Sequence, residues 1–151
     1  MTETEPARTP AQKKADSLHR MQNDKDLYIS TCDVSGNPCL VVISFYWNGS
    51  SLLVSTVETN PTGLNMAATG KARVALGLVR DVTLIETTAR LIPENELKAE
   101  DADAYIAKLG WDPRKSKGYR FYELVPVWVE AWRELNEHAD RVLMRDGNWI
   151  V

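Results

Sequence analysis

The chain has 151 residues and a formal net charge of −3 at pH 7, with 44% hydrophobic and 26% charged residues. This length and balance predict one globular domain that can build its own core. The acidic balance argues against a general nucleic-acid binder, which would need a basic face. No apolar run approaches the roughly 20 residues of a membrane span, and the polar N-terminus does not resemble a secretory signal. We therefore expect a cytoplasmic protein.

The N-terminal segment, residues 1–10, is predicted to be disordered because it is polar and contains two prolines. Residues 11–151 are expected to form the single domain. A helix is predicted over Ala11–Asn23, where small and apolar residues recur on one helical stripe.

Three strands are expected next in the chain, joined by turns that contain glycine. Leu27–Cys32 and Ser51–Thr56 flank Cys39–Trp47, whose nearly continuous apolar run predicts a strand buried on both faces. Cys32 and Cys39 are expected to face each other across the first hairpin. Their spacing allows a cross-strand disulfide, but a reducing cytosol favours two free thiols that pack in the core.

The second half continues this pattern of strands with inserted helices. A polar loop leads through Asn60-Pro61 into a short helix that ends at Gly70. The elements expected after it are strands over Ala72–Leu78 and Val82–Leu91, a helix over Pro93–Leu109, a strand over Tyr119–Arg133 and a tail, 134–151. Such closely spaced strands predict a mainly β fold with α segments, a small antiparallel barrel, and leave no room for βαβ crossovers.

The loop before the short helix is the strongest candidate for a binding site. Ser55 and Thr56 end a strand, and Asn60, Thr62 and Asn65 surround the start of the helix. The first amides of a helix are unpaired and its dipole is positive there, which suits a phosphate. The same residues also suit an ordinary helix start, with Asn as the cap and proline at the first position.

Recognisable catalytic motifs are absent from the sequence. The two histidines, His19 and His138, lie far apart, and the chain has no Walker A loop, no G-x-G-x-x-G and no C-x-x-C. We therefore predict no metal site and no catalytic side chain.

The order of these elements resembles the FMN-binding split barrels related to pyridoxamine phosphate oxidase. The resemblance covers roughly Asp26–Leu91, with further likeness in the tail from Trp132 to Trp149. It implies a six-stranded antiparallel split β-barrel of the FMN-binding type. It also implies a homodimer with two cofactor sites at the subunit interface, acting on a small-molecule substrate.

The resemblance also assigns site residues. It places the main chain of one strand along the flavin ring, two residues near the ribityl phosphate, a phosphate loop with the helix after it, and a corner reached from the partner subunit. In this order the residues are Leu40, Val41 and Val42; Ser55 and Thr56; Asn60, Thr62 and Asn65; and Arg80.

Two departures from the oxidase pattern affect the expected chemistry. Cys39 stands where the oxidases have an arginine, and Asn60-Pro61-Thr62 stands where they have Ser-Arg-Lys. Because charge-assisted contacts to phosphate are strong, FMN affinity should fall unless other cations compensate. The candidates are Lys71, Arg73, Arg80, Arg133, Arg141 and Arg145. Vitamin B6 oxidation is not expected.

The predicted function is hydride transfer to a small organic substrate by an oxidoreductase that uses FMN or, alternatively, the deazaflavin coenzyme F420. A second hypothesis is a non-catalytic cofactor-binding dimer, a carrier or sensor. A third is a barrel that has lost its cofactor and acts as an interaction module.

Overall fold

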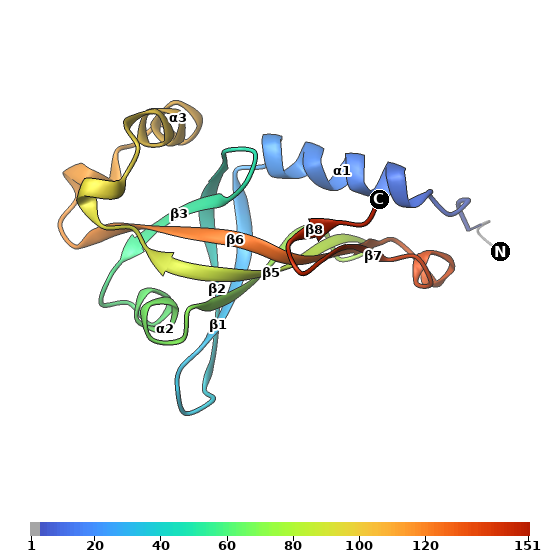
Figure 1. Cartoon of the computed structure of the whole chain (residues 1–151), viewed down its shortest axis with the longest axis horizontal. Helices are drawn as coiled ribbons and strands as arrows, with labels where there is room; N and C mark the ends of the chain where they lie inside the picture. Colours follow the sequence, from blue (N-terminus) through green and yellow to red (C-terminus); the bar gives the residue numbers. More distant parts are fainter. Residues whose placement is uncertain (1–3) are drawn as a thin grey trace.

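A computed structural model describes residues 4–151, which form an antiparallel β-barrel with flanking helices (Figure 1). The strands are β1 (Asp26–Cys32), β2 (Pro38–Trp47), β3 (Leu52–Val57), β4 (Lys71–Leu78), β5 (Asp81–Leu91), β6 (Tyr119–Trp132), β7 (Val142–Arg145) and β8 (Asn148–Trp149). The helices are α1 (Pro10–Asn23), α2 (Pro61–Thr69) and α3 (Ala99–Leu109), with short 3-10 helices η1 (Glu94–Glu96), η2 (Pro113–Lys115) and η3 (Leu135–Glu137).

The strands pair in the order β3-β2-β1-β4-β5-β6, and a further pairing of β3 with β6 closes these six into a barrel. β7 and β8 extend the sheet beyond β6. Every pairing is antiparallel. The predicted mainly β fold, a six-stranded antiparallel split barrel with α segments, is therefore confirmed.

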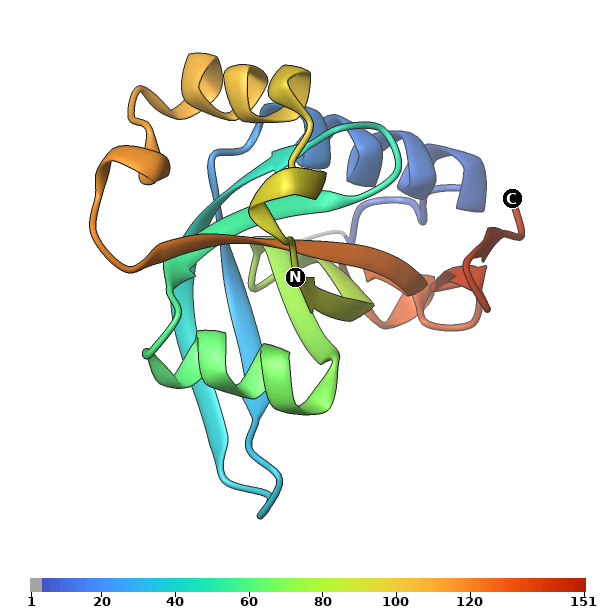
Figure 2. The same ribbon diagram turned by 60° about the vertical axis from the view of Figure 1, so that its left-hand side comes forward.

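Alternating side chains fill the barrel. In β4, Ala72, Val74 and Leu76 point inward and are buried, as period-two alternation predicts. α1 and α3 lie on one side of the barrel and α2 on the opposite side, as both views show (Figures 1 and 2). Met21 of α1 and Met66 of α2 are fully buried in the same core. No helix within residues 4–151 is long and apolar enough to cross a membrane.

The predicted helix over Pro93–Leu109 is wrong in its first part. η1 ends at Glu96, the chain is extended at Leu97, and α3 begins at Ala99. Leu97 packs against a second apolar cluster that contains Tyr105. This tertiary packing favours the extended backbone, and local helical periodicity gives no sign of it.

The expected tail, residues 134–151, contains a hairpin that the sequence analysis missed. β7 pairs with β6, and β8 folds back onto β7 through Asp146 and Gly147, whose φ angles are 50° and 77°. An Asp-Gly pair is the sequence signal for such a two-residue turn. Leu143 and Met144 of β7 complete the core.

A buried ion pair joins the N-terminal segment to the C-terminal part of the chain. The Glu137 side chain is 1% exposed and accepts hydrogen bonds from Arg8 Nε at 3.0 Å and Nη2 at 2.8 Å. Lys13 of α1 is fully buried and donates to the main-chain oxygen of Asp140 at 2.5 Å. Of the segment predicted to be disordered, residues 1–3 lie outside the described residues.

Candidate functional site

One half of β2 has no strand on its second side. β2 pairs with β1 from Pro38 to Ser44, but pairs with β3 only through Phe45, Tyr46 and Trp47. β3 then leaves β2 to pair with β6. Within the described chain, residues 38–44 therefore keep a free edge, on which main-chain N–H and C=O groups can bind a ligand.

The expectation that this strand is buried on both faces is wrong. Leu40, Val41 and Val42 are 66%, 37% and 60% exposed. Phe45 and Trp47, which pair with β3, are buried, whereas residues 40–42 precede that pairing. At this end the β1–β2 hairpin extends beyond the barrel body (Figure 1). Exposed apolar side chains beside a free strand edge suit contact with a flat apolar ligand or a second protein surface.

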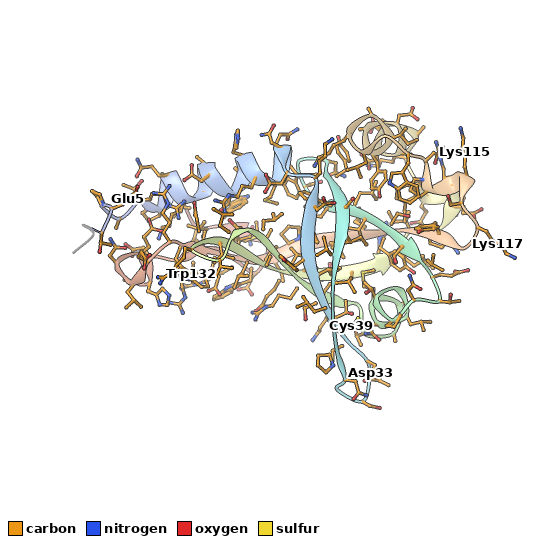
Figure 3. The ribbon with its side chains drawn as sticks, turned by 180° about the vertical axis from the view of Figure 1, so that it is seen from behind. Glu5, Asp33, Cys39, Lys115, Lys117 and Trp132 are labelled. Carbon is orange, nitrogen blue, oxygen red and sulfur yellow. The ribbon has the colours of Figure 1, made fainter. Side chains whose placement is uncertain are left out.

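The start of α2 lies against this half of β2. Thr62 Oγ1 of α2 is 3.8 Å from Cys39 Sγ, and Asn65 Nδ2 donates to Thr31 Oγ1 at 3.1 Å. Thr31 and Cys39 are register partners in β1 and β2. Figure 3 shows Cys39 on the hairpin next to α2. The structure thus places Thr62 beside β2, the strand that carries Leu40, Val41 and Val42, and places Asn65 beside its neighbour β1.

The first turn of α2 matches the predicted helix start. Asn60 is the N-cap, Pro61 occupies the first position, and Gly70 ends the helix with φ 67°. The Asn60 side chain makes no capping hydrogen bond. Because that side chain leaves the first amides uncapped, the positive end of the helix can accept an anion there.

The other predicted site residues lie in different settings. Ser55 is buried and its hydroxyl donates to the main-chain oxygen of Arg120 at 2.9 Å, which is a structural role. Thr56 is buried, and its hydroxyl has no hydrogen-bond partner among residues 4–151. Arg80 lies at the turn between β4 and β5, is 79% exposed, and pairs with Glu134 at 2.8 Å. Within one chain, the structure does not bring Arg80 to this group.

Cys32 and Cys39 are not directly opposed, so that prediction is wrong. The register pairs Thr31 with Cys39 and Cys32 with Pro38. A shift of one residue puts the two thiols on opposite faces of the hairpin. Both cysteines are free, but Cys32 is exposed and Cys39 is only partly buried, so the expectation that they pack in the core is wrong.

A cavity of about 630 Å³ is lined by the end of β1, by β4 and β5, and by the end of α2. Its lining includes Ser30, Cys32, Lys71, Arg73 and Thr88. Ser30, Cys32 and Thr88 are not among the predicted site residues, although alternation along β1 predicts that Ser30 and Cys32 face away from the core. Of the cations considered, Lys71 and Arg73 line this cavity, and Arg73 pairs with Glu86 across β4 and β5.

Replacing Gly63 with alanine should lower the free energy of unfolding by about 2 kcal/mol, because the helix start is packed too closely for a side chain. A Cβ there would lie 2.8 Å from Tyr122 Oη, 3.0 Å from Val57 O and 3.2 Å from Glu58 O. Since two of these atoms belong to the main chain, α2 must move away from β3. Urea denaturation measures the loss.

Leu64→Ala is the matched control for Gly63→Ala, since Leu64 is the next residue of α2 and is half-exposed. Its effect should be about 0.5 kcal/mol or less. A Gly63→Ala variant more stable than the wild type would show that α2 tolerates a side chain here and would contradict the close packing.

The barrel and its open strand edge define a split β-barrel, and a sequence match gives the family. The family model described as pyridoxamine 5′-phosphate oxidase matches residues 20–133. The chain belongs to the pyridoxamine 5′-phosphate oxidase family. No curated protein sequence matches it.

Solved structures with similar folds include two haem proteins and an F420 reductase. A haem-binding protein from Mycobacterium smegmatis has a TM-score of 0.70 and 13% identity, over 96% of this chain and 60% of that chain. HutZ, the haem storage protein of Vibrio cholerae, has a TM-score of 0.61 and 14% identity, over 75% and 89%. An F420 reductase has a TM-score of 0.56 and 13% identity, over 74% and 93%. At these identities the likeness concerns the fold alone.

Proposed function

We propose that this protein is a cytoplasmic oxidoreductase that binds a flavin-type cofactor, FMN or the deazaflavin coenzyme F420, at the free edge of β2. The observation that carries the proposal is the position of that edge beside the start of α2. One part of the site offers main-chain hydrogen bonds and apolar contacts. The other part offers unpaired amides and the Thr62 hydroxyl for a phosphate.

Different residues would bind the ring and the phosphate of the cofactor. Main-chain groups of residues 38–44 would hold the ring edge, and Leu40 and Val41 would exclude water from it. Thr62 and the first amides of α2 would hold the phosphate. The bound cofactor supplies hydride transfer. No histidine or carboxylate is assigned as an acid or base, so a proton would come from water or from a small organic substrate.

A homodimer fits the same surface. Tyr28 and Val42 are register partners on neighbouring strands, and Leu40 lies two residues along on the same face; all three are more than half exposed in the single chain. A second copy would cover this face. In such a dimer, the turn that carries Arg80 could approach the cofactor only from the partner subunit.

A non-catalytic cofactor-binding dimer is the second candidate. Cys39 and Asn60-Pro61-Thr62 replace the cations of the oxidase pattern, and no side chain is assigned as an acid or base. Together these two departures favour a non-catalytic role. Reduction of a bound cofactor followed by transfer to an acceptor distinguishes the two candidates.

The test is a visible absorption titration of the purified protein with FMN, F420 and haem in separate experiments. Saturable uptake of FMN or F420 at one per chain supports the proposal. Haem is included because the structurally similar proteins include a haem-binding protein and a haem storage protein. Uptake of haem alone, or of none of the three, would overturn it.

Thr62→Val should weaken FMN binding about tenfold, the effect of losing one hydrogen bond to a charged group. Riboflavin serves as the internal control because it lacks the phosphate, and its dissociation constant should not change. Fluorescence titration of both ligands measures the difference. An equal loss for riboflavin and FMN would mean that Thr62 acts through packing and does not contact the phosphate.

A further inference from the structure

A basic segment that is distant in sequence lies beside the turn leading into α2. This segment, residues 113–120, is called the basic loop here. Glu58 N donates to Gly118 O at 2.9 Å, and Val57 and Thr56 pair with Tyr119 and Arg120. In Figures 1 and 2 the orange basic loop runs along the same edge of the molecule as the green start of α2. The basic loop therefore continues the candidate phosphate site along this edge.

The basic loop carries more positive charge than its neighbours neutralise. Arg114 pairs with Asp112 at 2.9 Å, and Arg120 pairs with Glu58 at 3.4 Å. Lys115 and Lys117 have no ion-pair or hydrogen-bond partner for their side chains within residues 4–151. Figure 3 shows both lysines projecting outward from this edge.

The basic loop also borders a recess of about 490 Å³. Its charged lining consists of four cations and two carboxylates: Arg114, Lys115, Lys117, Arg120, Glu58 and Glu94. The positive charge that is missing from Asn60-Pro61-Thr62 is thus present on the neighbouring segment. Because both lysines are unpaired, an anion can bind there without first breaking an ion pair.

We propose that the basic loop binds an anionic extension of the cofactor that continues beyond the phosphate held at α2. This inference rests on the proposed function. A single phosphate is accommodated at the start of α2, so a ligand that ends there, such as FMN, has no group left for Lys115 and Lys117. A deazaflavin with a long anionic tail has such groups. The basic loop would therefore favour the tailed cofactor over FMN.

The experiment compares three ligands: F420 with its full tail, the same deazaflavin without phosphate or tail, and FMN. Lys115→Gln/Lys117→Gln should weaken binding of full-length F420 about fivefold, as expected for the loss of two exposed ion pairs. It should leave the dissociation constants of the other two ligands unchanged. Added salt should weaken F420 binding less in the variant than in the wild type.

Lys14→Gln is the matched control for removing a lysine charge, since Lys14 lies on α1 near the other end of the molecule (Figure 1). It should leave all three dissociation constants unchanged. Unchanged F420 binding in the double variant, or an equal loss for F420 and FMN, would overturn the role of the basic loop while leaving the proposed function intact. A wild type that binds neither F420 nor FMN would overturn the proposed function itself.

Discussion

Glu137→Gln should lower the free energy of unfolding by about 3 kcal/mol at neutral pH, the usual effect of breaking a buried ion pair. The carboxylate accepts four hydrogen bonds, from Arg8 N, Nε and Nη2 and from Arg133 N, at 2.8, 3.0, 2.8 and 2.9 Å. A glutamine keeps the shape but has one acceptor oxygen and no charge. The Arg8 side chain, 8% exposed, would lose its most deeply buried partner and keep Asp16 at 2.8 Å and Asp81 at 3.2 Å. Urea denaturation measures the difference.

This effect should depend on pH in a defined direction. Hydrogen bonds from Arg8 lower the pKa of the Glu137 carboxyl from 4.5 to about 2. Because the folded-state pKa lies below the unfolded one, the stabilisation is complete above about pH 4.5 and is lost as the pH falls toward 2. The difference between wild type and Glu137→Gln should therefore shrink across this range.

Glu134→Gln is the control for this experiment, since it removes an exposed carboxylate that pairs with Arg80. Its expected effect is about 0.5 kcal/mol, as for surface ion pairs in general. Equal effects of the two variants would mean that the Arg8–Glu137 pair contributes no more than a surface contact.

Val42→Asp should convert the proposed dimer into a monomer and abolish cofactor binding. Val42 is 60% exposed in the single chain, in a face shared with Tyr28 and Leu40. In a dimer that buries this face, the aspartate would be a buried charge without a partner, which costs several kcal/mol. Sedimentation equilibrium measures the assembly, and circular dichroism checks that the barrel is folded.

Leu135→Asp is the control for Val42→Asp, since Leu135 is an 82% exposed apolar residue of η3, outside this face. It should leave assembly unchanged. A monomeric wild type, or a Val42→Asp variant that remains dimeric, would contradict an interface on this face.

Local sequence patterns predicted most of the elements, and the order of these elements with the tail carried the resemblance to the family. Alternation in β4 indicated an inward row of Ala72, Val74 and Leu76, which is buried. Asn60-Pro61 and Gly70 indicated where α2 begins and ends, and it does so at these positions. These signals are readable because they depend on backbone geometry and on neighbours a few residues away.

The sequence by itself determined where most strands lie along the chain and where α2 begins and ends, since both depend on local periodicity and helix-end signals. The tertiary structure decided the exposure of Val41 and Val42, because β3 leaves β2 to pair with β6. It also decided which cations lie near α2. Arg80 lies at the turn between β4 and β5 of its own chain, and its approach to the cofactor from a partner subunit stays a prediction. Lys115 and Lys117 lie on the segment whose Gly118 accepts a hydrogen bond from Glu58 at the turn into α2. Their position follows from closure of the barrel between β3 and β6, whose paired residues are 62 to 72 positions apart in the sequence. No local pattern indicates such a contact.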